Sequence, residues 1–289
     1  MKKVISGIVI IVLLGVAALF GYNWWQQQQQ PETITEVAPS VIAPEPVVVP
    51  PAVETPPPIL HPIEPPPPTE EPLPTVQDSD KVLGEALSDV VGPSVWKALF
   101  FPDLLIRHIV ATVDNLPRHE APSKMWPIRP AGSWIKTKGT EGSLTLDPAN
   151  AERYAPYVAM VQQLSVDKLV TVYRQFYSLF QQAYKELGYP DAYFNDRLVV
   201  AIDDMLAAPE PEGPIELIQN KVRYQFADAD LESRSAGQKI MLRIGVENAR
   251  IVKAKLRKLR AAITQFSAKP VSTKPVSSPQ ITPQQKTTQ

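Results

Sequence analysis

The sequence predicts a mainly α-helical, bundle-like domain with one or two small β-hairpins, preceded by a transmembrane helix and a proline-rich linker. Residues 4–20 are almost wholly apolar, and residues 31–76 hold sixteen of the 32 prolines. Between residues 78 and 266, apolar side chains recur at helical spacing. The predicted segments are therefore an anchor (1–25), a disordered stalk (26–77), a helical domain (78–266) and a disordered tail (267–289).

The first segment fits a single membrane-spanning helix. Two lysines precede the apolar run, and Tyr22, Trp24 and Trp25 follow it, where aromatic rings suit the membrane interface. Since basic residues favour the cytoplasmic side, we expect a cytoplasmic N-terminus, a span within residues 4–25 and an external C-terminal domain. The alternative is a signal peptide cleaved near Ala18, although the apolar run continues beyond that point.

Residues 31–76 form the predicted stalk. Proline fixes φ and lacks an amide donor, so this stretch favours extended polyproline II and buries no core. At ~3.1 Å per residue its upper limit of reach is ~140 Å. Residues 31–80 carry nine acidic side chains and no basic one, whereas residues 81–289 carry 27 basic and 21 acidic ones. The stalk is thus either extended or folded back onto a basic surface, and salt would weaken the second state.

Two helices are predicted at the start of the domain. Asp78 or Ser79 can cap a helix that ends at Gly92, and a second helix starts near Pro102 and contributes to the core. Residues 116–133 contain four prolines, which indicates a loop.

The centre of the domain combines a hairpin with the clearest helix. Residues 134–146 form a predicted hairpin around a four-residue turn, and Asp147-Pro148 then opens a helix that Pro156 divides. The long helix spans residues 166–187 and ends at Gly188. Five aromatic side chains follow its apolar stripe, for which core packing is a better explanation than a ligand groove.

The remaining elements are predicted from similar patterns. A helix covers residues 195–207, and a proline- and glutamate-rich turn then leads to short strands at 215–218 and 222–226. Helices at 228–244 and 246–266 complete a domain of about six to eight helices.

The residues that carry most enzyme and metal chemistry are scarce. The chain has no cysteine and three histidines, at 61, 108 and 119, no two of which share a ligand or catalytic spacing. We therefore expect no metal site and no cofactor. Carboxylates are the remaining catalytic option, above all Asp203-Asp204, but adjacent helix positions point about 100° apart and fit a solvated face better. Individual candidates are Asp114, Glu216 and Glu232.

The last helix carries a basic face made of Arg250, Lys253, Arg257 and Arg260, spaced by three, four and three residues. Plain solvation explains such a face. The functional alternative is attraction to an anionic partner, such as acidic lipid, a wall polymer, an acidic protein or the stalk itself. Nucleic acid is not an expected partner outside the cytoplasm.

Four segments carry a resemblance to a known family. They are ATVDNLPR (111–118), LDPAN with RY (146–154), ELGYP with YFNDRL (186–198) and SAGQK (235–239). In this order they resemble the uncharacterised bacterial family known as domain of unknown function 3014, over residues 78–262. The resemblance implies a Gram-negative envelope setting, with the anchor in the inner membrane and the domain in the periplasm. It implies no activity, cofactor or catalytic residue.

The sequence therefore predicts a membrane-anchored envelope protein whose periplasmic domain binds or scaffolds an envelope protein or wall polymer without being an enzyme. One alternative is an enzyme that modifies wall polymers by carboxylate acid/base chemistry. Another is an assembly factor for a membrane complex. The candidate partner-binding residues are polar residues of the family-like segments, namely Asp114, Asn115, Arg118, Asn195, Asp196 and Arg197. Their alternative role is structural, as helix caps and loop braces.

Overall fold

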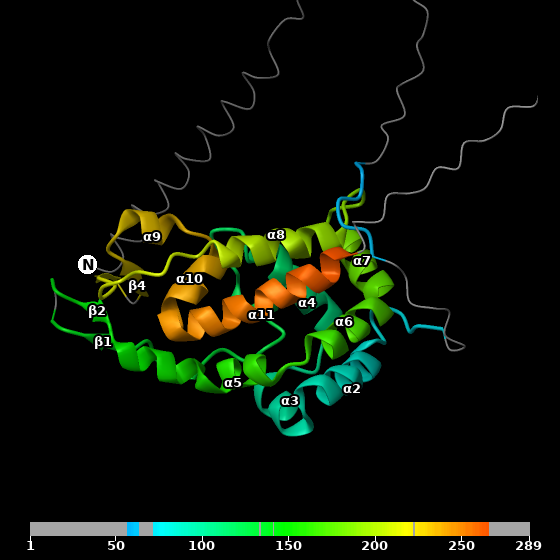
Figure 1. Ribbon diagram of the computed structural model, residues 1–289, viewed down its shortest axis with the longest axis horizontal. Helices are drawn as coiled ribbons and strands as arrows, with labels where there is room; N and C mark the ends of the chain where they lie inside the picture. Colours follow the sequence, from blue (N-terminus) through cyan, green and yellow to red (C-terminus); the bar gives the residue numbers. More distant parts are fainter. Residues whose placement is uncertain (1–56, 64–71, 133, 141, 222, 266–289) are drawn as a thin grey trace, which may run out of the picture. The chain divides into compact units, whose positions relative to one another are not determined.

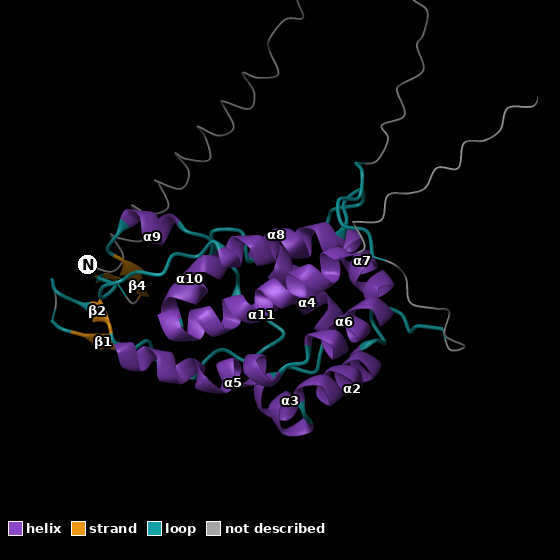
Figure 2. Cartoon of the chain, in the orientation of Figure 1, coloured by secondary structure: helices purple, strands orange, loops and turns teal. Residues whose placement is uncertain are grey.

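The structure, a computed structural model, describes residues 57–63, 72–132, 134–140, 142–221 and 223–265, all within the compact unit Thr55–Gln289. The predicted anchor, most of the stalk and the tail lie outside these residues. Among the helices of the described part, none is both long and apolar enough to cross a membrane. The described part is mainly helical with two small antiparallel hairpins, as the sequence predicts (Figure 2).

The described residues form ten α-helices rather than the expected six to eight. The α-helices are α2 (Asp80–Val91), α3 (Pro93–Leu99), α4 (Leu105–Asn115), α5 (Ala155–Gln163), α6 (Val166–Gln175), α7 (Tyr177–Glu186), α8 (Phe194–Leu206), α9 (Ala229–Ser233), α10 (Ala236–Arg243) and α11 (Val246–Thr264). Two 3-10 helices, η1 (Ser123–Met125) and η2 (Pro148–Tyr154), lie in the connections.

The strands make two separate hairpins. β1 (Thr137–Lys138) pairs with β2 (Thr145–Leu146), and β3 (Leu217–Asn220) pairs with β4 (Arg223–Phe226). A single bridge between Thr145 and Glu216 joins the two hairpins. Leu217 and Phe226, opposite each other in the second hairpin, are buried with Leu242 of α10, so this hairpin is fixed to the helical part through its apolar face.

The last helix, α11, crosses the middle of the view in Figure 1. It packs against α8, α5, α6 and α10, while α4 packs against α7 and α8, and α2 against α3, α4 and α6. The buried Ile263 near the end of α11 contacts Val170 of α6 and Val199 and Ile202 of α8. The C-terminal helix is therefore part of the core.

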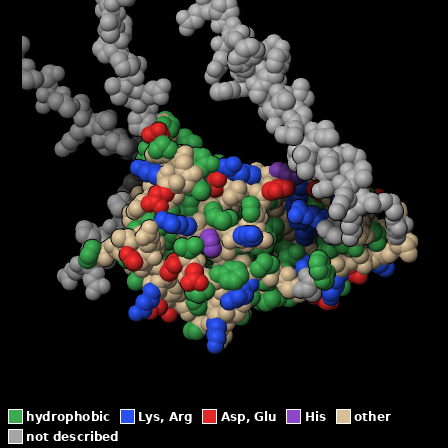
Figure 3. Space-filling view, turned by 180° about the vertical axis from the view of Figure 1, so that it is seen from behind, with side chains coloured by type: hydrophobic (Ala, Val, Ile, Leu, Met, Phe, Trp, Pro, Cys, Tyr) green, Lys and Arg blue, Asp and Glu red, His purple; other side chains and the backbone are tan. Residues whose placement is uncertain are grey.

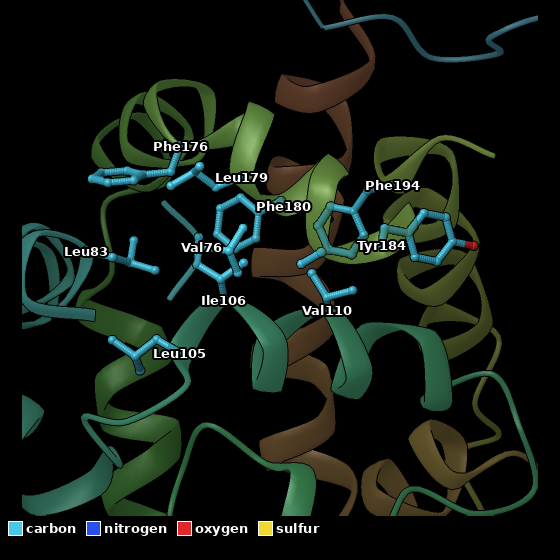
Figure 4. Packing of buried hydrophobic residues seen from close by; sticks show 11 residues of the cluster. Val76, Leu83, Leu105, Ile106, Val110, Phe176, Leu179, Phe180, Tyr184 and Phe194 are labelled. Atoms are coloured by element: carbon cyan, nitrogen blue, oxygen red, sulfur yellow. The ribbon is translucent and has the colours of Figure 1, made fainter. Parts of the chain in front are cut away.

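The largest apolar cluster joins α2, α4, α7 and the start of α8 (Figure 4). Its fully buried members include Leu83, Ile106, Phe176 and Phe194. Val76, which precedes α2, also lies in this cluster with 6% of its surface exposed. Packed contacts therefore begin before residue 78, where the sequence pattern sets the start of the domain.

Local capping explains where several helices begin. Asp147 accepts a hydrogen bond from the Ala149 amide at the start of η2. The second predicted helix begins at Leu105 rather than near Pro102, because Asp80 of α2 accepts hydrogen bonds from the amides of Leu104 (2.6 Å) and Leu105 (2.8 Å). A carboxylate of α2 thus caps the start of α4.

Two predicted helices are each divided in the structure. The predicted helix over 166–187 breaks at Phe176, which is fully buried and has φ −99° and ψ 8°, outside the helical values. The predicted helix over 228–244 breaks at Arg234, before Ser235 caps α10 by accepting from the Gln238 amide. Both predictions of one continuous helix were wrong, since packing overrides helical propensity at these points.

Candidate functional site

Asp114, at the C-terminal end of α4, is the centre of a polar cluster. Its carboxylate is 6% exposed and accepts hydrogen bonds from Arg118 Nη2 at 2.8 Å and from Arg197 Nε at 3.0 Å. The Tyr189 hydroxyl also lies within hydrogen-bond distance of Asp114 Oδ2, at 3.3 Å. Arg197 Nη2 donates in addition to the Asp114 carbonyl. We define Asp114, Arg118, Tyr189 and Arg197 as the Asp114 cluster.

The cluster contains one carboxylate and two guanidinium groups, so it carries a net positive charge. The side chain of Arg197 is 21% exposed, whereas that of Arg118 is 48% exposed. The Asp114 carboxylate raises the pKa of Arg118 above its ordinary value. Arg118 also donates to the Asp114 carbonyl through Nε and to the Tyr189 hydroxyl through Nη2, while its Nη1 donates no hydrogen bond to the described residues.

The SAGQK segment packs directly behind Arg118. The amides of Ala236 and Gly237 donate to the carbonyls of Arg118 at 2.6 Å and Leu116 at 2.8 Å. A Cβ atom at Gly237 would lie 2.9 Å from Met205 Cγ and 3.2 Å from the Leu116 oxygen, so the close approach requires glycine. Three of the four family-like segments therefore meet around Asp114.

The other predicted partner-binding residues lie in two different environments. Asn195 and Asp196, at the start of α8, hydrogen-bond to the backbone of Leu60 and His61 in the stalk. Asn115 donates through Nδ2 to the Ala111 carbonyl of its own helix at 2.7 Å. The structure therefore brings Asp114, Arg118 and Arg197 together, while Asn195 and Asp196 bind the stalk and Asn115 braces α4.

The predicted basic face of α11 is largely neutralised by internal partners. Arg250 and Lys253 pair with Glu210 at 2.9 and 2.8 Å, and their hydrogen bonds, that of Lys253 first, lower the pKa of Glu210. Arg260 pairs with Asp203 of α8, and Arg257 is exposed. The basic face of α11 therefore does not form a continuous field of unpaired positive charge. On the opposite side of the molecule from the view of Figure 1, shown in Figure 3, lysine, arginine and acidic side chains are also interspersed.

Of the carboxylates considered for catalysis, Asp114, Asp203, Asp204 and Glu232 are engaged in structural contacts, whereas Glu216 is exposed. Asp203 pairs with Arg260, whereas Asp204 accepts from the Ser235 hydroxyl and from Gln238 Nε2, so the adjacent aspartates serve different partners. Adjacent helix positions point about 100° apart, which accounts for this divergence. A shallow cavity of ≈ 320 Å³ lies beside the start of α11, but its acidic residues Asp147 and Glu247 cap η2 and pair with Arg250.

Sequence reasoning missed two contributors to these polar contacts. One is Tyr189, which lies in a family-like segment and is not among the predicted site residues; its ring stacks on that of Tyr184, with the centroids 4.7 Å apart. The buried Lys239 Nζ lies 3.2 Å from both Glu232 Oε1 and His119 Nε2. The sequence signal for Lys239 is only its place in the family-like SAGQK segment, since His119 is 120 residues away in the chain.

The comparison with protein-family models gives one match. The family described as protein of unknown function (DUF3014) matches residues 105–260, which is more than half of the chain. The chain belongs to the DUF3014 family. The search of curated proteins and the search of solved structures give no significant match.

The DUF3014 match starts at α4 and ends within α11. It is shorter at its N-terminal end than the predicted range of 78–262, so α2 and α3 precede the matched region. The Asp114 cluster and the residues that bind the stalk, Asn195 and Asp196, lie inside it. The stalk residues that they bind lie outside it.

Proposed function

We propose that this DUF3014 protein is a membrane-anchored envelope protein whose periplasmic domain binds a partner and does not catalyse a reaction. Residues 4–25 would hold it in the inner membrane, with the proline-rich stalk between anchor and domain. The partner is an envelope protein or a wall polymer that presents hydrogen-bond acceptors. The proposal rests on the geometry around Arg118.

The observation that carries the proposal is the partial exposure of a braced guanidinium group. Arg118 is held through Nε and Nη2 by Asp114 and Tyr189, while about half of its side chain faces solvent. Such bracing lowers the conformational entropy that an arginine loses on binding. Carboxylate, phosphate or carbonyl oxygens are suitable acceptors for its remaining N–H donors.

The enzymatic alternative has less support from the geometry. Asp114, Asp203, Asp204 and Glu232 each have a cation or a hydrogen-bond donor as a structural partner. A general acid needs a carboxyl group that is free to reach its substrate. Incubation of purified wall material with the full chain should therefore release no product, and product release would favour the enzyme.

Photocrosslinking in cells tests the binding proposal. A photoreactive residue at Glu120 or Asp191, both exposed and close in sequence to Arg118 and Tyr189, should form a discrete adduct with a protein or wall fragment. The matched control is Lys81, an exposed position on α2. Arg118→Gln should reduce the adducts at both test positions. Equal labelling at Lys81, or adducts that are indifferent to Arg118→Gln, would refute this surface.

Exchange of the anchor separates binding from an assembly role within the membrane. Replacing residues 1–25 by an unrelated single span should preserve the adducts if the domain acts through its own surface. Loss of the adducts with an unrelated anchor, at equal protein level, would instead favour an assembly factor that recognises its complex through the membrane segment.

A further inference from the structure

A short piece of the predicted stalk is bound to the domain. The Asp196 carboxylate accepts two hydrogen bonds, from the Leu60 amide at 3.1 Å and from the His61 amide at 2.7 Å. Asn195 Nδ2 donates to the His61 carbonyl at 2.8 Å. All three bonds go to backbone atoms, while the side chains of Ile59 and Leu60 stay exposed. These three hydrogen bonds therefore do not depend on the side chains of Ile59 and Leu60.

The side chain of Asn195 is held in place by hydrogen bonds within the domain. Asn195 is fully buried, and its Oδ1 accepts a hydrogen bond from the Tyr173 hydroxyl at 3.1 Å. Its Nδ2 also donates to the Ile263 carbonyl of α11 at 3.3 Å. Tyr173 of α6 and Ile263 of α11 thus orient the side-chain amide of Asn195 on α8. This amide directs its other N–H group to the stalk. A side chain held in this way loses little freedom when it binds a ligand.

The bound segment bends at Leu60 and His61, and the bend brings two consecutive amides to one carboxylate. Residues 56–62 read PPPILHP, so the two bound amides lie between prolines. Proline has a fixed φ, which limits the conformations that the chain can adopt before and after the bend. A proline at position 60 or 61 would itself remove a donor. The matching ligand is therefore a chain that bends at two consecutive non-proline residues and has prolines before and after them.

We propose that Asn195 and Asp196 form a binding site for a bent, proline-framed peptide backbone, and that residues 57–63 occupy this site in cis. We name it the stalk clamp. Because the segment is joined to the same domain through residues 64–71, its effective concentration at the site is on the order of millimolar. A free peptide of the same kind must compete with it, so the stalk regulates access to its own site.

Hydrogen–deuterium exchange of the full chain tests the cis contact. His61→Pro removes one of the two donors to Asp196, and the Leu60 amide should then exchange at least about tenfold faster, the factor that corresponds to one charge-assisted hydrogen bond. Ile59→Pro is the matched control, since the Ile59 amide donates no hydrogen bond within the described part of the chain. It should leave exchange at Leu60 and His61 unchanged. Equal exchange in the unaltered and His61→Pro chains would overturn the proposal.

A variant of the clamp itself gives a second readout. Asp196→Ala should release both amides, with exchange at Leu60 and His61 faster by at least about tenfold. Retained protection in Asp196→Ala would count against the clamp. If Asp196→Ala does not fold, the His61→Pro and Ile59→Pro variants still test the proposal, because they leave every residue of the helical domain unaltered. Protection that depends on protein concentration would show that a second copy supplies the segment, which would overturn the cis assignment.

Binding of a free peptide tests the ligand class. A fluorescent peptide with the sequence PPPILHPIE should bind the full chain that carries His61→Pro, measured by anisotropy. The unaltered chain should bind it at least about tenfold more weakly, because the tethered segment competes. A peptide with proline in place of its histidine is the control and should bind neither chain. Failure of the His61→Pro chain to bind PPPILHPIE would refute a peptide site, and equal binding by the two chains would refute cis occupancy.

Discussion

Replacement of Asp114 by alanine should destabilise the domain more than any other single change in its polar cluster. The carboxylate is 6% exposed and joins α4 to α8 and to the loop that carries Tyr189. Asp114→Ala would leave two guanidinium groups close together without a counter-charge. Removing one partner of a buried ion pair costs about 3–5 kcal/mol.

The exposed fractions of the two arginine side chains indicate how much of this cost each ion pair contributes. Arg118 is 48% exposed, and an exposed ion pair contributes about 0–1 kcal/mol because water screens it. Arg197 is only 21% exposed and accounts for most of the loss. Since the cluster is only partly buried, we expect Asp114→Ala to lower the free energy of unfolding by about 2–4 kcal/mol.

Urea unfolding followed by tryptophan fluorescence measures these differences. Asp114→Ala should be the most destabilising variant, followed by Arg197→Gln, with Arg118→Gln costing less than about 1 kcal/mol. Asp114→Asn keeps an acceptor oxygen and should lose less than the alanine variant. The prediction is wrong if Arg118→Gln lowers the free energy of unfolding as much as Asp114→Ala does. It is also wrong if Asp114→Ala lowers that free energy by less than about 1 kcal/mol, because the ion pair between Arg197 and Asp114 would then not be the main stabilising contact.

Three further outcomes follow from packing and titration. Gly237→Ala places Cβ 2.9 Å from Met205 Cγ, so it should lower the free energy of unfolding by about 1–3 kcal/mol in a urea melt. A fragment that starts at residue 78 lacks the buried Val76 and should be less stable than one that starts at residue 72 by about 2 kcal/mol, measured by the same assay. Burial raises the pKa of Tyr177 to about 12, so stability should be intact below pH 10 and fall as pH rises from 10 towards 12, and Tyr177→Phe should reduce that fall in melts at successive pH values.

Each of these outcomes has a matched control. Gly213→Ala introduces a Cβ into open space and should be nearly neutral, so an equal effect at both glycines would contradict the close-approach argument. Val76→Ala in the longer fragment should reproduce part of the truncation effect. A Tyr177→Phe chain with the same alkaline loss as the unaltered chain would show that other groups, such as Tyr173, determine it.

The sequence predicts the ends of helices best where they are determined by the residue at that position and its immediate neighbours. Gly92, with φ at 92°, ends α2 where predicted, and Asp147 caps η2 as its position before a proline indicates. The break at Phe176 was not predictable, because the apolar spacing continues through it without proline or glycine. It arises because α6 packs towards α8 and α11, whereas α7 packs on α4, and the chain must turn between these two cores.

The candidate site was predictable only in part for the same reason. The family-like segments point to Asp114, Arg118 and Arg197, but nothing local indicates that these three converge, since Arg197 is 83 residues from Asp114. The partner of Asp196 is 135 residues away, in a stretch whose acidic charge suggested a contact only with a basic surface. The pairing of Lys253 and Arg250 with Glu210 likewise depends on how the α8–β3 connection lies along α11, which periodicity does not specify.

The position of the stalk clamp also determines how a mechanical load enters the domain. A pull on the chain from its N-terminal side reaches the three hydrogen bonds at His61 and Leu60 before it reaches α2. The three hydrogen bonds would therefore be loaded before the contacts that Val76 and α2 make with the core. The clamp would open under this load before the helical domain unfolds.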